Sequence, residues 1–108
     1  MSLEFNYEIH KDSMGDNIFF YGNIDSYTEP HFEEIVRKIS GRRVVMDFSN
    51  AVRINSMGMA ILLRTIKHVK TEKKSEVIIV GENKTIALLF KITGLYALSG
   101  QPPRYTQI

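Results

Sequence analysis

The sequence lacks cysteine, tryptophan and any long apolar segment. Without cysteine the chain has no disulfides and no thiolate metal sites, which agrees with a reducing compartment. No apolar run approaches the roughly 20 residues that a membrane-spanning helix needs. Met1–Phe5 has neither the basic start nor the apolar core of a signal peptide. The expected location is therefore the cytosol of a bacterium or an archaeon.

The chain is also poor in net charge. Its formal charge of +2 is too small to indicate a nucleic-acid partner. A hydrophobic fraction of 44% and a charged fraction of 24% are typical of globular proteins. At 108 residues we expect a single domain over 1–108, with its core at about 5–98 and a tail at 99–108.

The N-terminal part predicts a β-hairpin at one edge of a sheet. Apolar and polar residues alternate from Phe5 to His10, which is the period of a half-buried strand. Lys11–Asp16 has the composition of a turn, and Asn17–Ile24 predicts the second, antiparallel strand.

A first helix is expected to follow this hairpin. Thr28 is a suitable N-cap, and Tyr27 with Phe32 fits a hydrophobic staple. Gly41 is the expected stop. The apolar residues that this helix would bury are Phe32, Ile35, Val36 and Ile39.

The remaining elements alternate between strand and helix. Val44–Phe48 predicts a strand that is buried on both faces, followed by a short polar loop ending in Asn55-Ser56. A helix extends from there to about Thr71, and Val77–Val80 predicts a strand parallel to Val44–Phe48.

Asn83 can cap a last helix that stops at Gly94. Pro102-Pro103 prevents further helix, and Tyr105–Ile108 is a weaker candidate for an edge strand. The predicted fold is α/β, with a mixed four- to five-stranded sheet, an N-terminal antiparallel hairpin, parallel inner strands and three main helices.

Ser56 is the residue around which the predicted functional site is organised. It lies where the apolar strand Val44–Phe48 gives way to a helix. In open α/β sheets, ligands and modifications favour the carboxyl ends of strands. From residue preferences alone, the simplest role for Ser56 is that of a helix N-cap.

The order of motifs resembles the STAS domain of the bacterial anti-sigma factor antagonists. The resemblance covers about 5–98 and is strongest in Val45-Met46-Asp47-Phe48 followed by Asn55-Ser56-Met57-Gly58. Gly22-Asn23-Ile24-Asp25 and Thr93-Gly94-Leu95 support it. Each motif is common, but their order and spacing together are fairly specific.

The resemblance implies a role for Ser56. In that family this serine is phosphorylated by a partner that is both an anti-sigma factor and a serine kinase. The unphosphorylated protein binds the kinase and displaces the sigma factor, whereas the phosphorylated protein releases the kinase. The family's acidic residue before the serine is Asn55 here, which keeps an N-cap but removes a charge. That change either slows phosphorylation or reduces repulsion of the incoming phosphate.

The helix after Ser56 predicts a surface for that protein partner. Its first turns are apolar on more than one face, and Met side chains beside a glycine suit an adaptable contact. A phosphate there would add repulsion and a desolvation cost. The predicted partner-binding residues are Asn55, Ser56, Met57, Gly58, Ala60 and Ile61. Met57, Ala60 and Ile61 would form a stripe that nothing covers; alternatively, Met57 and Ile61 would complete a helix packed on both sides. A homodimer also stays open.

The sequence predicts no enzyme, no cofactor and no metal site. Ile54-Asn55-Ser56-Met57-Gly58 lacks the first glycine of an esterase nucleophile motif, and His68 lies ~18 Å along the same helix. The three histidines have no metal-ligand spacing. Two alternatives remain beside the switch. One is an unphosphorylated STAS subunit that supports a transporter or a larger signalling assembly, and the other is an enzymatic or nucleotide-binding role.

Overall fold

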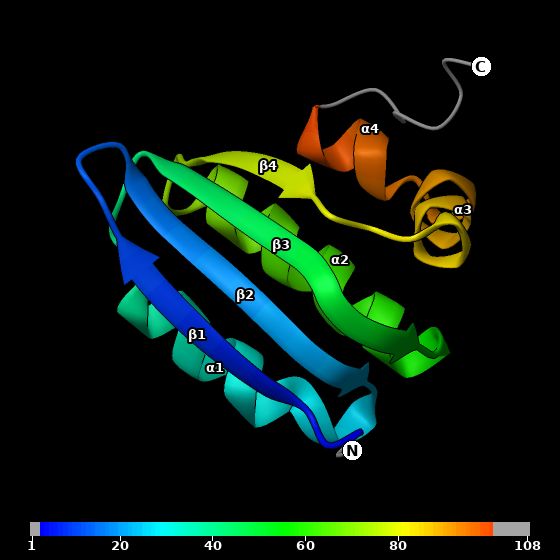
Figure 1. Cartoon of the computed structure of the whole chain (residues 1–108). Coiled ribbons are helices and arrows are strands. Elements are labelled where there is room, and N and C mark those ends of the chain that lie inside the picture. Colours follow the sequence, from blue (N-terminus) through cyan, green and yellow to red (C-terminus); the bar gives the residue numbers. More distant parts are fainter. Residues whose placement is uncertain (1–2, 101–108) are drawn as a thin grey trace.

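A four-stranded mixed sheet forms the centre of the molecule (Figure 1). The computed structural model describes residues 3–100. The spatial order is β1-β2-β3-β4, with β1 antiparallel to β2 and the other neighbours parallel. The α/β fold with an edge hairpin and parallel inner strands is confirmed. The strands are β1 (Asn6–Lys11), β2 (Gly15–Ile24), β3 (Arg43–Ile54) and β4 (Glu76–Val80).

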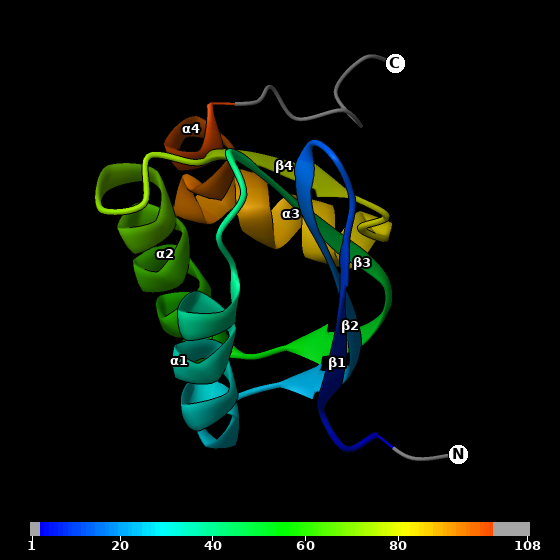
Figure 2. The same ribbon diagram turned by 90° about the vertical axis from the view of Figure 1, so that its left-hand side faces the viewer.

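Helices cover one face of this sheet. Figure 2 shows α1 and α2 side by side on that face. The helical elements are η1 (Ser26–Thr28), α1 (Glu29–Lys38), α2 (Ser56–Thr71), α3 (Lys84–Thr93) and the short α4 (Leu95–Ser99). The sequence predicted the three longer helices and missed α4.

The core lies between the helices and the covered face. Phe20 of β2 stacks on Phe48 of β3 with ring centroids 4.9 Å apart. Phe32 of α1 contacts Phe20 at 5.5 Å, and Phe90 of α3 contacts Phe48 at 5.1 Å. These four buried rings join two strands to two helices. Burying such large side chains is the main stabilising contribution to a domain of this size.

The prediction that Val44–Phe48 is buried on both faces is wrong. Along β3, Val44, Met46 and Phe48 are buried, whereas the residues between them are only partly covered. The described helices leave the second face of the sheet open, so the strand alternates between core and surface despite its apolar sequence.

β3 is also longer than predicted. The polar stretch after Phe48, expected as a loop, continues the strand to Ile54 and remains paired with β2 as far as Ile24. Two register shifts in the pairing accommodate it. Pairing with β2 therefore outweighs the polar composition of this stretch. As a result, β3 ends at Ile54, directly before the start of α2.

The start of α1 differs from the prediction as well. Asp25 accepts a hydrogen bond from the Tyr27 N–H and caps η1. Thr28 precedes α1 but its hydroxyl donates to the Asp25 carbonyl, at 2.7 Å, instead of capping the helix. Tyr27 is 86% exposed and forms no staple with Phe32.

The end of α1 does not need Gly41. The helix stops at Lys38, because Ile39 has an extended backbone. Gly41 instead packs against Gly15, and a Cβ atom there would lie 2.3 Å from the Gly15 Cα. Asn83 and Gly94 begin and end α3 as predicted. The edge strand expected at Tyr105–Ile108 lies outside the described residues.

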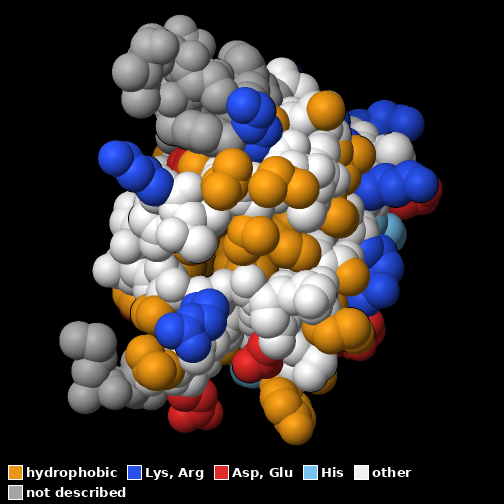
Figure 3. Space-filling view, turned by 90° about the vertical axis from the view of Figure 1, so that its right-hand side faces the viewer, with side chains coloured by type: hydrophobic (Ala, Val, Ile, Leu, Met, Phe, Trp, Pro, Cys, Tyr) orange, Lys and Arg blue, Asp and Glu red, His pale blue; other side chains and the backbone are white. Residues whose placement is uncertain are grey.

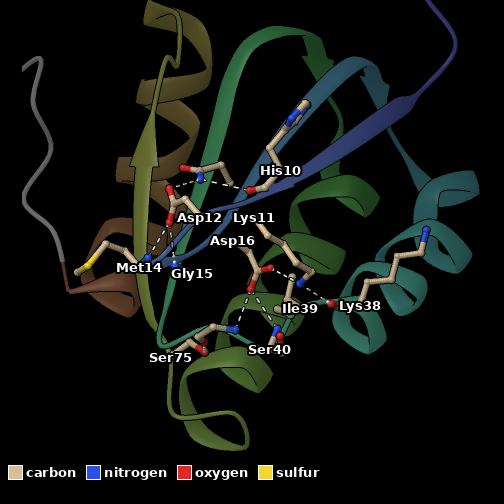
Figure 4. A network of polar contacts seen from close by, with 12 residues as sticks. His10, Lys11, Asp12, Met14, Gly15, Asp16, Lys38, Ile39, Ser40 and Ser75 are labelled. Carbon is tan, nitrogen blue, oxygen red and sulfur yellow. Dashed lines mark hydrogen bonds and ion pairs between the residues drawn. The ribbon is translucent and has the colours of Figure 1, made fainter.

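A buried carboxylate joins the hairpin to the α1–β3 connection (Figure 4). Asp16 is 2% exposed and accepts hydrogen bonds from the N–H groups of Ser40 and Gly41 at 3.0 and 2.8 Å. The Lys11 ammonium pairs with its other oxygen and also donates to the Lys38 carbonyl. Burial alone would raise the pKa of Asp16, but these hydrogen bonds outweigh it, so the pKa of this carboxyl is lowered.

We expect Asp16→Asn to lower the free energy of unfolding by about 1–3 kcal/mol at neutral pH, because hydrogen bonds to a charged acceptor are lost. Urea denaturation followed by circular dichroism measures this. A carboxyl with a lowered pKa stabilises the fold above its unfolded pKa of about 3.9 and loses that contribution as pH falls through the folded pKa. The difference between wild type and variant should therefore shrink below about pH 4.

Glu33→Gln is the control, since Glu33 is exposed on α1. A difference between Asp16→Asn and wild type that stays constant from neutral pH to the acid limit would contradict this account.

Candidate functional site

Asn55, and not Ser56, caps α2. Its side-chain oxygen accepts a hydrogen bond from the Gly58 N–H at 2.8 Å, and its carbonyl accepts from the Met59 N–H at 2.9 Å. The Asn55 N–H donates to the Ile24 carbonyl at the end of β2. The cap role considered for Ser56 is therefore wrong, and the hydrogen bonds of Asn55 fix the start of α2.

Ser56 is the first residue of α2 and is exposed. Its hydroxyl makes no hydrogen bond within residues 3–100. The fold thus presents this hydroxyl to solvent at a helix N-terminus, where the helix dipole favours negative charge. α2 has no acidic residue in its first turn, so no fixed carboxylate of its own opposes a phosphate there.

Gly58 faces the sheet. A Cβ atom at this position would lie 2.2 Å from the Ile24 carbonyl oxygen. This close approach lets the first turn of α2 rest on the end of β2. Gly58 is buried, so its part in the predicted partner surface is not an exposed one.

The predicted uncovered stripe is only partly correct. Met57 is 57% exposed and Ala60 is exposed, but Ile61 is 3% exposed and belongs to the core. Ile61 points inward because it lies three positions after Gly58 and four before Thr65, which are both on the wide buried face of α2. Its place on a partner surface is therefore corrected.

Other apolar side chains are exposed on the same side of the molecule. The face that carries α3 and the β3–α2 corner shows several hydrophobic patches separated by backbone and by other side chains (Figure 3). Val52 of β3 is 43% exposed, and Leu88 and Ile92 of α3 are 49% and 70% exposed. The sequence analysis did not identify these three side chains as exposed. The helical periodicity of α3 does, however, place Leu88 and Ile92 on the face of the helix opposite its buried side.

No candidate metal site accompanies Ser56 in the described chain. His10, His31 and His68 lie on β1, α1 and α2. Across residues 3–100 no group of acidic, histidine or cysteine side chains could hold a metal ion. In the same range, no helix is both long enough and apolar enough to cross a membrane.

The sequence pattern of the STAS domain matches residues 16–105. The chain belongs to the STAS family. The STAS match covers β2 to α4 and includes the whole Ser56 corner. No curated protein matches the chain significantly.

Solved structures share this STAS fold. An anti-sigma factor antagonist from Mycobacterium paratuberculosis is 20% identical, with a TM-score of 0.70 over 95% of this chain and 89% of that one. Unphosphorylated SpoIIAA, an anti-sigma factor antagonist, is 13% identical, with a TM-score of 0.69 over 86% and 84%.

The phosphorylated form of SpoIIAA, a Bacillus cell fate determinant, is 12% identical, with a TM-score of 0.63 over 86% and 87%. At these identities the likeness concerns the fold.

We expect Asn55→Ala to lower the free energy of unfolding by about 1 kcal/mol, because α2 loses its cap. Ser56→Ala should change it by less than about 0.5 kcal/mol, since the hydroxyl has no bond to lose. Denaturant titration of the two variants measures both. A larger loss for Ser56→Ala than for Asn55→Ala would show that the serine is the cap after all.

Proposed function

We propose that this STAS protein is a non-catalytic regulator in a partner-switching pathway. Its partner would be an anti-sigma factor that is also a serine kinase, and phosphorylation of Ser56 would control their contact. The observation that carries the proposal is the exposed Ser56 hydroxyl, free of hydrogen bonds among the described residues, in the first turn of α2. Its place in a member of this family supports the assignment.

The partner surface would be built from the exposed residues of the corner. Asn55, Ser56, Met57 and Ala60 are exposed there, and the Met57 side chain can adapt to a partner. Gly58 is buried and acts by allowing α2 to approach β2, whereas Ile61 belongs to the core and is not part of this surface. Val52, on the strand that leads into α2, is exposed as well.

The chemistry of the switch would be supplied by the partner. The γ-phosphoryl group of ATP held by the kinase is transferred to the Ser56 oxygen, whose proton leaves, and ADP is the other product. The added group carries about −1.5 to −2 charges at neutral pH. Because the Ser56 hydroxyl makes no hydrogen bond to other described residues, the phosphate should change the surface and leave the fold intact.

At position 55 this chain has an asparagine where the resemblance to the antagonists implies an acidic residue. Its amide oxygen makes the cap bond to Gly58 that a carboxylate oxygen could also make. The structural role is therefore kept and only the charge is lost. If a carboxylate helps the kinase, Asn55→Asp should speed phosphorylation of Ser56. If repulsion of the incoming phosphate matters more, the same variant should slow it.

We expect Ser56→Asp to abolish recovery of the kinase partner in affinity purification from the native cells, because a charge then lies in the contact. Ser56→Ala should recover the partner at least as well as wild type. Ser13→Asp is the matched control, because it adds the same charge at an exposed serine of the hairpin turn, outside the predicted partner surface, and should recover the partner as wild type does. Quantitative mass spectrometry of the purified complexes measures the partner.

The alternative is an unphosphorylated subunit that supports a transporter or a larger assembly. Equal recovery of one partner by Ser56→Asp, Ser56→Ala and wild type would contradict the switch and favour that alternative. Recovery of a transporter component instead of a kinase would decide for it.

A further inference from the structure

β1 is the edge strand of the sheet, and its outer side is unpaired within the described chain (Figure 1). An unpaired edge presents a row of backbone donors and acceptors to which another strand can add. This edge consists of six residues of regular strand without proline. It does not include the Ser56 corner, so what binds there is independent of the proposed switch.

The direction of the backbone groups along β1 follows from its pairing with β2. The Asp12 N–H donates to the Gly15 carbonyl, and the register continues with Lys11 opposite Asp16. In an antiparallel pair, alternate residues direct both backbone groups to the partner strand. Glu8 and His10 therefore face β2, while the N–H and C=O groups of Tyr7, Ile9 and Lys11 face outward.

We propose that two copies of the chain pair antiparallel through β1, around a twofold axis at Ile9. In that register Ile9 meets Ile9 of the second copy, and Tyr7 meets Lys11 in both directions. These are the residues whose backbone groups face outward, so the hydrogen-bond pattern and the twofold axis agree. A twofold interface of this kind uses the same surface on both copies.

The side chains on the open face of the sheet fit the same register. Glu8 of each copy comes to lie opposite His10 of the other. Both side chains are exposed, at 52% and 63%, and they already contact each other within one strand at 3.0 Å. Acceptor and donor thus alternate along this face of the edge, and Glu8 does not oppose Glu8.

A groove of about 610 Å³ lies on the opposite side of the edge, between β1 and α1. It is lined by Tyr7, Ile9 and Lys11 of β1 and by His31, Glu34 and Lys38 of α1. Tyr7 and Ile9 are half-buried and pack against the core from this groove. Ile9 of the second copy would cover the apolar surface that they leave exposed, which is a favourable burial.

Lys11 does not block this pairing. An edge lysine commonly prevents strand addition, because its charge would be buried next to another strand. Here the Lys11 ammonium is directed to the buried Asp16 carboxylate and the Lys38 carbonyl (Figure 4). Its charge is compensated within its own copy, so it does not repel the second one.

The test is a mixed disulfide between two single-cysteine variants of the full chain, Glu8→Cys and His10→Cys. The chain has no cysteine of its own, so each variant has one thiol. Positions 8 and 10 would face each other as a non-hydrogen-bonded pair with Cα atoms about 4.5 Å apart, which a disulfide can bridge. Two thiols at the same position would lie diagonally, about 7–8 Å apart.

We expect the mixture to form the cross-linked dimer at least about tenfold faster than either variant alone, because paired thiols react at an effective concentration on the order of millimolar. Ser13→Cys mixed with His10→Cys is the control for random collision, since Ser13 is exposed in the hairpin turn. Equal rates in the mixed, single and control samples would overturn the proposal.

Sedimentation equilibrium of the wild-type chain provides the second measurement. A dimer is expected, and a chain that stays monomeric over the whole accessible concentration range would overturn the proposal. A dimer that cross-links no faster in the mixed sample would also overturn it, because the contact would then lie elsewhere.

Discussion

The geometry of the Ser56 corner depends on how closely the first turn of α2 approaches the end of β2. The Ile24 carbonyl accepts the Asn55 N–H, and Gly58 lies against the same carbonyl with no room for a Cβ atom. With the backbone fixed there, the Asn55 side chain caps the helix and the next side chain must point away from the sheet. Ser56 is exposed as a consequence of this contact and not because the chain is poorly packed there.

This arrangement separates the fold from the proposed signal. The bonds that hold the corner are made by Asn55 and Gly58, and none of them uses the Ser56 side chain. A charge can therefore be added at Ser56 with little cost to stability, while any protein that covers Met57 and Ala60 would have to accommodate it. The buried carboxylate that joins the hairpin to the α1–β3 connection belongs to a different part of the structure and serves stability.

Much of the fold could be predicted from the sequence, because the local sequence patterns of these elements agree with the tertiary structure. The alternation in β1, the apolar stripe of α2 and the caps Asn83 and Gly94 depend on neighbours in sequence, and the structure confirms them. The position of Ser56 at the start of a helix was predicted for the same reason.

The errors concern features that only tertiary contacts determine. β3 extends through a polar stretch because β2 pairs with it to Ile54. Thr28 donates its hydroxyl to the Asp25 carbonyl and does not cap α1, whereas the Asp25 side chain caps η1. Ile61 is buried because the covered face of α2 is wider than one stripe. The cap role expected for Ser56 from residue preferences belongs to Asn55, whose bond to Gly58 confirms that this asparagine keeps the N-cap.

The central claim is that Ser56 carries a phosphate in the cell and that the phosphate excludes the partner. Trypsin cleaves after Arg53 and Arg64, and Ser56 is the only hydroxyl side chain in the peptide between them. The direct measurement is the phosphorylated fraction of that peptide, determined by mass spectrometry in the partner-bound and the free protein from native cells. The account predicts phosphate in the free fraction and almost none in the bound fraction. An unmodified Ser56 in both fractions, under conditions that dissociate the complex, would contradict it.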